Sequence, residues 1–346
     1  MCNLCKVLLI MAITVLLAGC TKVENTRQMP EEEEVKIQIG MIFDNFVMER
    51  WQRDRDVFVS TAKELGAEVN VQNANSSVQE QIDLIEYFIK KKVDVIVIIP
   101  IDSEPLLEPI KKAQEEGIKV ISYDRLVVGA EPDLYISFDN TKVGALMGNA
   151  LGEKLEEGDK VLMICGPETD NNAIEVQSGF REIMDAKKIE ILDIYHTDGW
   201  TPEYAAMYVR QNSDRLHEVK AIMCGNDNLA GQVVGVLAEQ RLAGEIYVTG
   251  QDADLAACQR IVEGTQYMTV YKSIEKMAAK AAKVTVDIAE NNDFDYGFYL
   301  TEDGKQIRYI KLEPVAVYED NIQEVIIDSG FHLKEDVYLN RPDLLE

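Results

Sequence analysis

The sequence predicts an α/β protein made of two doubly wound parallel-sheet lobes that a multi-strand hinge joins. Three observations lead to this prediction. Short apolar, β-rich runs alternate with amphipathic stretches, ten such runs occur after residue 34, and the pattern changes after about residue 272. Apolar strands that alternate with helices indicate a parallel sheet covered on both faces. Ten strands are many for one open sheet, so two lobes fit better.

The chain begins with a segment that we expect to be removed rather than folded. Lys6 precedes a short apolar run, residues 7–19, which continues into LLAGC and matches a bacterial lipoprotein signal. We therefore expect residues 1–19 to be a signal peptide and Cys20 to carry lipid, so that the protein is extracytoplasmic and anchored to the cell membrane. An uncleaved anchor is the alternative. Residues 20–34 are polar and lack apolar periodicity, which is typical of a disordered tether.

The predicted strands follow in order, each identified by a run of apolar and β-branched residues. They are Val35–Phe43, Ala67–Gln72, Val93–Pro100, Ile118–Asp124, Asp133–Phe138, Asp159–Cys165, Ile189–His196, Val219–Gly225, Glu245–Gly250 and Tyr267–Tyr271. Helical periodicity fills most of the intervals between them. The clearest examples are Asp54–Gly66, Val78–Lys91, Ser103–Gly117 and Glu203–Leu216.

The last part of the chain predicts how the two lobes are connected. A long helix begins near Lys272, and a hairpin around residues 302–304 precedes an extended segment. We place the first lobe at residues 35–139 and 272–312, and the second lobe at 140–271 and 313–346. Two lobes with several crossings enclose a cleft that can close on a small molecule.

Composition excludes several classes of function. The formal net charge of −26 leaves no basic stripe for nucleic acid. The three cysteines that remain after Cys20 are odd in number and lack C-x-x-C spacing, and the three histidines are scattered. We expect no disulfide framework, no metal site and no cofactor. Gly-rich phosphate loops and the G-x-S-x-G motif are also missing, which argues against an enzyme.

Polar and aromatic side chains follow the predicted strands. Ligands of open parallel sheets bind beyond the carboxyl ends of the strands, so these residues are the candidate site. Carboxylates, amides and cations can satisfy sugar hydroxyls, and aromatic rings pack on sugar C–H faces. Acids and bases are interspersed, which favours an uncharged ligand. The residues at these ends are Asp44, Arg50, Trp51, Asp124, Arg125, Asp170, Asn171, Asn172, Trp200, Asn226, Asp227, Gln251, Asp252 and Lys272.

Each of these residues also has a structural interpretation. Trp51 shares a helical stripe with Phe58, Ala62 and Leu65, which favours a core residue, although its place in the first turn lets the stripe reach past the sheet edge into a cleft. Asp170 and Asn226 are typical helix N-caps. The neighbours at 124 and 125 could form a local ion pair, and the lysine at 272 could be a solvated helix start. The coincidence of these residue types at the strand ends is what favours a site.

Several motifs together resemble a known family. They are ERWQRDRD, VDVIVIIP, ISYDR, YISFDN, DNNA, DGW, GQDADLAACQRIVEGTQYMTVYK and GFH, spread from about Val35 to about Leu333. They resemble the type I periplasmic sugar-binding proteins of the pentose- and hexose-binding group. The resemblance implies the fold of that family and a monosaccharide ligand, D-xylose or a close relative. It also implies a monomer that delivers the sugar to an ABC permease.

The resemblance also implies a role for each candidate residue. In the first lobe, Arg50 and Arg125 would donate to the sugar, Asp124 would accept from two hydroxyls, and Trp51 would stack on one ring face. Polar contacts would come from the second lobe, Trp200 would stack on the opposite face, and the lysine would donate near the hinge. The second-lobe polar residues are Asp170, Asn172, Asn226 and Asp252, and the lysine near the hinge is Lys272.

Two segments depart from the family pattern, and three other functions compete. In MIFDNFVMER, residues 41–50, the stretch between the strand and ERW differs, which leaves the first-lobe rim uncertain. The hairpin also differs but is expected to lie away from the cleft. A sugar sensor that signals to a receptor or histidine kinase would use the same fold. A repressor would need an N-terminal helix-turn-helix where the signal stands. An enzyme would need a nucleophile and base, which the strand ends lack.

Overall fold

The computed structural model describes residues 36–301 and 303–345, which belong to one compact unit that begins at Lys36. The expected signal peptide, the lipid on Cys20 and the tether lie outside the described residues. Among the residues that are described, no helix has the length and apolar character that a membrane span requires.

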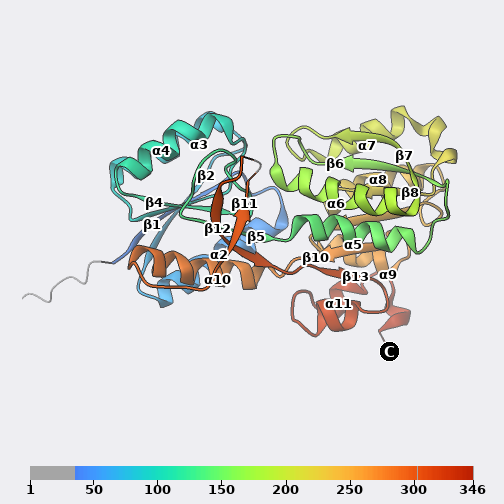
Figure 1. The fold of residues 1–346 in the computed structure, drawn as a ribbon. Coiled ribbons are helices and arrows are strands. Elements are labelled where there is room, and N and C mark those ends of the chain that lie inside the picture. The colour runs from blue at the N-terminus through green and yellow to red at the C-terminus, as the bar shows by residue number, and fades with distance from the viewer. Residues whose placement is uncertain (1–35, 302, 346) are drawn as a thin grey trace, which may run out of the picture. The chain divides into compact units, whose positions relative to one another are not determined.

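The first sheet has seven strands in the order β11-β12-β5-β4-β3-β1-β2 (Figure 1). Neighbours from β12 to β2 run parallel, and only β11 is antiparallel to its neighbour. Alternate residues of a strand point to opposite faces, and both faces here are buried, which explains the continuous apolar runs. The strands are β1 (Gln38–Phe43), β2 (Glu68–Asn73), β3 (Val95–Ile98), β4 (Lys119–Tyr123), β5 (Leu134–Phe138), β11 (Gly297–Leu300) and β12 (Gln306–Leu312).

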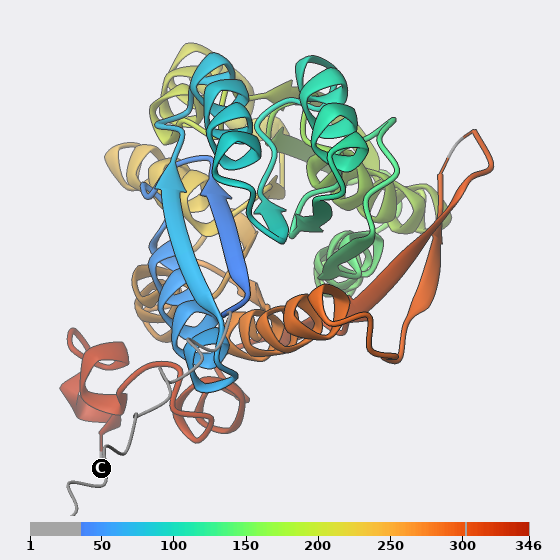
Figure 2. The same ribbon diagram turned by 90° about the vertical axis from the view of Figure 1, so that its left-hand side faces the viewer.

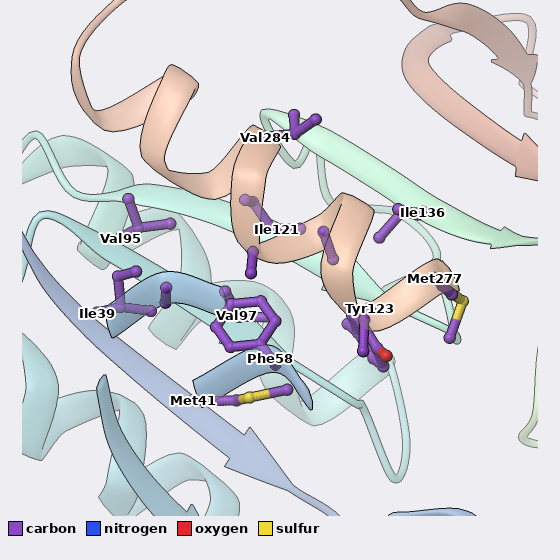
Figure 3. Packing of buried hydrophobic residues seen from close by; sticks show 14 of the residues in the cluster. Ile39, Met41, Phe58, Val95, Val97, Ile121, Tyr123, Ile136, Met277 and Val284 are labelled. Carbon is purple, nitrogen blue, oxygen red and sulfur yellow. The ribbon is translucent and has the colours of Figure 1, made fainter. Parts of the chain in front are cut away.

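Helices cover both faces of the first sheet. Phe58 of α2 and Met277 of α10 belong to one buried cluster with the strand residues Met41, Val97 and Tyr123 on one face, as Figure 3 shows. The other face packs on α3 and α4. The helices are α2 (Glu49–Glu64), α3 (Val78–Lys91), α4 (Leu107–Glu115) after the 3-10 turn η1 (Glu104–Leu106), and α10 (Ile274–Ala289).

Helix α3 shows how the local sequence sets these boundaries. The Ser77 hydroxyl accepts a hydrogen bond from the backbone N–H of Glu80 and caps the first turn. Leu84, Ile85 and Phe88 fall on one stripe and are buried against the sheet. The helix ends at Lys92, whose φ of 56° cannot continue it.

The second sheet has six strands in the order β13-β10-β9-β8-β6-β7. All neighbours are parallel except β13, which runs antiparallel to β10. Helices α5 and α6 cover one face, and α7 and α8 cover the other. The strands are β6 (Lys160–Cys165), β7 (Glu190–His196), β8 (Ala221–Cys224), β9 (Tyr247–Gln251), β10 (Met268–Tyr271) and β13 (Val315–Val317).

The second lobe contains the remaining helices. Helix α9 packs with the C-terminal segment around Tyr271 and Phe331. The elements are α5 (Asn140–Gly152), α6 (Asn171–Lys187), α7 (Pro202–Gln211), η2 (Ser213–Glu218), α8 (Asp227–Glu239), α9 (Leu255–Val262), the π-helical turn η3 (Gln323–Ile327), α11 (Lys334–Val337) and η4 (Pro342–Leu344).

The chain crosses between the sheets three times. It passes from β5 to α5, from β10 to α10, and from β12 to β13 (Figure 1). The predicted two-lobe α/β fold is therefore confirmed. The lobe boundaries at 139/140, 271/272 and 312/313 remain a proposal, which the sheet membership of the strands supports.

The hairpin β11–β12 extends from the edge of the first sheet (Figure 2). It lines no part of the central cavity, which agrees with the expectation that it lies away from the cleft, but it also contacts the second lobe. The Tyr299 hydroxyl donates to Glu175 Oε1 of α6 at 2.7 Å. Tyr299 also lies against Tyr135 and Tyr309, which anchor the hairpin to the sheet. The Tyr299 hydroxyl therefore connects the hairpin to the second lobe. Local sequence patterns do not predict such a contact between distant residues.

The described cysteines are buried in the second lobe. They are Cys165, Cys224 and Cys258, and Cys258 Sγ donates to Ala253 O at 3.6 Å. Burial raises the pKa of Cys165 to about 12, so this thiol stays protonated and packs as a small apolar side chain. Within residues 36–301 and 303–345, no group of three or more metal-ligating side chains is assembled.

Candidate functional site

The candidate site is a cavity at the carboxyl ends of strands from both sheets. Its empty volume is about 300 Å³, against about 1400 Å³ for an open hollow on the second lobe. Met48 and Gln251 line it together with all ten residues to which the family resemblance gives a role, whereas Asp44, Asn171 and Asp227 from the strand ends do not line it. Those ten are Arg50, Trp51, Asp124, Arg125, Asp170, Asn172, Trp200, Asn226, Asp252 and Lys272. The structure thus gathers them in one place, and their role as ligand contacts remains a proposal.

Arg50 lies at the centre of the first-lobe wall. It stands in the first turn of α2, and its side chain is only 5% exposed. Its guanidinium contacts three carboxylates: Asp124 at 2.6 Å, Asp54 at 3.4 Å and Asp252 of the second lobe at 3.7 Å. It also lies 4.3 Å from the Trp51 ring centre, within cation–π range. Arg50 therefore connects the two lobes and holds the indole on one side of the cavity.

Arg125 makes a second set of contacts between the lobes. Its Nη1 lies 2.8 Å from Asp44, and its Nε lies 2.8 Å from Asp170 of the second lobe. A local ion pair with Asp124, the structural alternative, is therefore wrong. Asp124 turns the other way, where Asn172 Nδ2 donates to its Oδ1 at 3.0 Å. The two neighbours thus contact different partners across the cavity.

The helix caps of the second lobe also face the cavity. Asp170 Oδ1 accepts from the backbone N–H of Asn172, and its Oδ2 accepts from Trp200 Nε1 at 2.9 Å. Asn226 Oδ1 accepts from the backbone N–H of Leu229 at 2.9 Å and caps α8. Capping and lining the cavity are therefore compatible, because each side chain has a second polar edge.

Every carboxylate of the site already has a cationic partner. Lys272 is buried and lies 2.7 Å from Asp252, so the solvated-helix alternative is wrong. The other four pair with the two arginines, and the pairs are Asp44–Arg125, Asp170–Arg125, Asp54–Arg50 and Asp124–Arg50. An anionic ligand would find no unpaired cation among these groups, and each carboxylate already contacts at least one cation. The electrostatics therefore favour a neutral ligand with hydroxyl groups.

Trp51 belongs both to the core and to the site. It is 1% exposed, packs edge-on against Phe43 at 6.2 Å and joins the main cluster with Phe58. The predicted stripe is wrong at Leu65, which is 44% exposed. Among the described residues, the Trp51 indole N–H has no hydrogen-bond partner. A buried donor without a partner is costly, and a ligand oxygen in the cavity would satisfy it.

Trp200 lies on two glycines that end neighbouring strands. Its ring packs on Gly166 after β6 and on Gly225 after β8. A Cβ atom at Gly166 would overlap the indole, and one at Gly225 would lie 3.1 Å from it. The Asp170 carboxylate holds the indole N–H on the far edge. The two Cys-Gly dipeptides of the sequence thus provide a flat seat for this ring.

We expect Gly166→Ala to weaken ligand binding about tenfold. The added methyl group would overlap Trp200 and displace its ring, and overpacking of this kind typically costs about 1–3 kcal/mol. Isothermal titration with the preferred sugar measures the change. Gly235→Ala is the matched control, since nothing lies within 4 Å of its added Cβ. Unchanged affinity in Gly166→Ala would show that the position of the indole is unimportant.

Three of the lining residues adopt positive φ angles. The values are 61° at Asp124, 61° at Trp200 and 100° at Asp252. Side chains other than glycine rarely adopt this region, and residues held there cluster at functional sites. The turns come directly after strands or short loops, where they redirect the side chain toward the cavity. Strain of this kind supports the assignment of the cavity as a site.

Two lining residues received no role from the sequence: Gln251, which was named only as a strand-end residue, and Met48, which was not named. Gln251 stands next to Asp252, and its Nε2 donates to Gly225 O at 2.5 Å while its buried Oε1 has no partner among the described residues. Its place at a strand end was the available signal. Met48 lies in the rim segment that departs from the family pattern, and its sulfur lies 3.8 Å from Asn226 Nδ2. No sequence signal identified Met48.

Burial shifts the pKa of Asp54, which stands behind Arg50. The Asp54 carboxylate accepts hydrogen bonds from Arg50 Nε and from the Tyr123 hydroxyl. Desolvation nevertheless dominates and raises its pKa to about 6. At Asp124 burial also favours the neutral form, but Arg50 and Lys272 outweigh it and hold the pKa below its usual value. The pKa values of Asp54 and Asp124, which both contact Arg50, are therefore shifted in opposite directions.

We expect Asp54→Asn to remove one component of the pH dependence of stability. Because its pKa is higher in the folded protein, Asp54 makes the wild type less stable as pH rises from the ordinary value of 3.8 to about 6. The free energy of unfolding of the wild type, relative to the variant, should fall by on the order of 1–3 kcal/mol over this interval. Urea unfolding at a series of pH values measures it. A difference that is constant with pH would contradict the assignment.

Comparisons with known proteins agree with this geometry. A family model described as a periplasmic binding protein domain matches residues 39–293. The D-xylose-binding periplasmic protein of Haemophilus influenzae is 41% identical over 308 residues, which cover 87% of this chain and 92% of that protein. The protein of the same name from Escherichia coli K12 is 39% identical, with 93% and 98% covered.

Solved structures show the same arrangement of elements. An ABC transporter solute-binding protein from Clostridium phytofermentans with bound β-D-glucose aligns with a TM-score of 0.78 at 26% identity, covering 87% of this chain and 99% of that one. A carbohydrate transporter solute-binding protein from Chloroflexus aurantiacus, in complex with D-glucose, aligns with a TM-score of 0.80 at 25% identity. It covers 86% of this chain and 98% of its own.

Proposed function

Because this chain belongs to the periplasmic binding protein family, we propose that it captures D-xylose, or a closely related monosaccharide, and delivers it to an ABC permease. Like these relatives, the chain is a sugar-binding transport protein and not an enzyme. The observation that carries the proposal is the small cavity that both Trp51 and Trp200 line, whose carboxylates all contact cations.

The chemistry of the cavity suits a pyranose. Two indoles stand on its walls, and apolar C–H faces of a sugar ring pack favourably on such surfaces. Each hydroxyl donates once and accepts twice, so it can insert between a carboxylate and its cationic partner. The unpartnered Trp51 indole N–H and Gln251 Oε1 offer one further donor and one further acceptor. Inside a closed cavity these hydrogen bonds are stronger than in water.

The mechanism that we propose is hinge closure. A sugar bound to one lobe would recruit the other, since Arg50 and Arg125 already join carboxylates from both lobes. Binding would thereby shift the population from open to closed. The closed form presents both lobes to the permease. The three crossings of the chain between the sheets would form the hinge.

A sensor is the second candidate, because a receptor or kinase would read the same closed form. Deletion of the gene separates the two, since loss of sugar uptake indicates transport and loss of induction alone indicates sensing.

We further propose that the protein is a monomer anchored through lipid on Cys20. Cys20→Ser should then move the protein from the membrane fraction to the soluble fraction.

A thermal-shift and calorimetric panel tests the ligand. We expect D-xylose to raise Tm of the purified protein more than arabinose, ribose or glucose, because only the folded state binds it. D-Glucuronate, a charged sugar, serves as the control and should bind weakly. A larger shift with another monosaccharide would correct the ligand, and no shift with any sugar would end the proposal.

A further inference from the structure

The turn that carries Asp252 is strained at two successive residues. Asp252 has φ of 100° and Ala253 has φ of 56°. Neither is glycine, and each such residue persists only where its surroundings hold it in place. Ala253 is fully buried, so the strain is internal to the second lobe and not a feature of an exposed loop.

Several hydrogen bonds hold this turn in place. The backbone N–H of Asp252 donates to Val270 O at 2.9 Å, and that of Ala253 donates to Thr269 Oγ1 at 3.3 Å. The Ala253 carbonyl is held from the other side, where His332 Nε2 donates to it at 2.8 Å. A carbonyl can only accept, so the imidazole carries its proton on this nitrogen.

His332 reaches the turn from a distant part of the chain. It precedes α11, lies 79 residues after Ala253 and is 6% exposed. Its ring lies 4.5 Å from that of Phe331. The Phe331 carbonyl in turn accepts from Arg53 Nη1 of α2 at 2.8 Å. The C-terminal segment therefore touches both the strained turn and the first lobe.

We propose that His332 is a positioning residue for ligand binding, which it supports by holding the strained Asp252–Ala253 turn. Loss of its hydrogen bond would let the Ala253 peptide relax toward negative φ. The Asp252 carboxylate would then leave its place 2.7 Å from Lys272 and 3.7 Å from Arg50. The inference rests on the proposed function, in which Asp252 contacts the sugar.

The first test compares three substitutions by calorimetry with D-xylose. His332→Ala should raise Kd about five- to tenfold, the effect of one hydrogen bond. His332→Gln, which keeps an N–H donor at similar reach, should bind nearly as tightly as the wild type. Adding Ala253→Gly to His332→Ala should recover most of the loss, because glycine adopts positive φ without strain. Failure of this rescue, or an unchanged Kd in His332→Ala, would overturn the proposal.

A second test asks whether His332 acts through Asp252. In an Asp252→Gly background, where the carboxylate is missing, His332→Ala should leave Kd unchanged. The same loss in both backgrounds would mean that His332 acts on the fold generally, and the proposal would fail.

A measurement without ligand separates this inference from the proposed function. Ala253→Gly should raise Tm of His332→Ala more than it raises Tm of the wild type, since the strain is relieved where its support is missing. Equal shifts would overturn the strained-turn argument even if sugars bind. Absence of sugar binding by the wild type would instead refute the proposed function and leave this comparison standing.

Discussion

Arg50→Met is expected to lower the free energy of unfolding by about 3–5 kcal/mol and to abolish sugar binding, because it breaks a buried ion network by removing the shared cation. The guanidinium lies within 4 Å of Asp54, Asp124 and Asp252, and its side chain is 5% exposed. Methionine has similar length and can fill the space, so the loss reflects charge rather than a void. Urea unfolding and calorimetry measure the two effects.

The pH dependence of this variant identifies the cause. Without Arg50 the buried carboxylates of Asp54 and Asp124 lose their main attraction, and their pKa values rise in the folded state. A raised carboxyl pKa favours folding at low pH, so the deficit relative to wild type should shrink as pH falls. A small deficit that does not depend on pH would contradict the network.

Arg55→Met provides the matched control in the same helix. Arg55 pairs with Asp56 at 2.7 Å, and its side chain is 36% exposed. Exposed pairs contribute about 0–1 kcal/mol, so this substitution should change stability little and leave sugar affinity intact. A comparable loss in both variants would show that any arginine-to-methionine change in α2 destabilises the protein, whether or not the arginine belongs to the buried ion network.

Asp252→Asn is expected to weaken sugar binding by about 1.5–3 kcal/mol, roughly 10- to 100-fold. Asparagine keeps the shape of the side chain and tolerates positive φ, so the turn should survive. The charge is lost, however, and Lys272 remains buried without the carboxylate that lies 2.7 Å away. A carboxylate accepts strong, charge-assisted hydrogen bonds from sugar hydroxyls, whereas the asparagine amide accepts weaker, neutral ones.

Calorimetry with D-xylose measures the loss, and Asp185→Asn is the control. Asp185 belongs to α6 of the same lobe but is exposed and lines no part of the central cavity. Its substitution changes net charge by the same amount without touching the site. Tight binding by Asp252→Asn would mean that the sugar occupies another part of the cavity.

The site could be located from the sequence because of a general property of parallel sheets. Strands that run the same way bring their carboxyl ends to one edge, so residues after different strands become neighbours. Trp51, Asp124, Trp200 and Lys272 are far apart in sequence, yet they line one cavity. Strand periodicity and the residue types at the strand ends predicted this edge of the sheets, and the family resemblance selected ten of the residues that line the cavity.

The pairing of these residues could not be predicted in the same way. Asp124 and Arg125 are adjacent, but a φ of 61° at Asp124 sends the two side chains to different partners. Asp54 reads as one more charge on the surface of a helix, whereas it is fully buried beside Arg50. Met48 enters the cavity from a rim whose sequence carried no signal.

The amino-acid sequence alone determined the alternation of strands and helices, the two-lobe class and the group of side chains at the strand ends, because each depends on local periodicity and short spacing. Only the tertiary structure decided which carboxylate pairs with which cation, how the Trp200 indole is seated on glycines, and how His332 reaches a strained turn. Those contacts join residues tens to hundreds of positions apart, and their geometry depends on how two lobes pack.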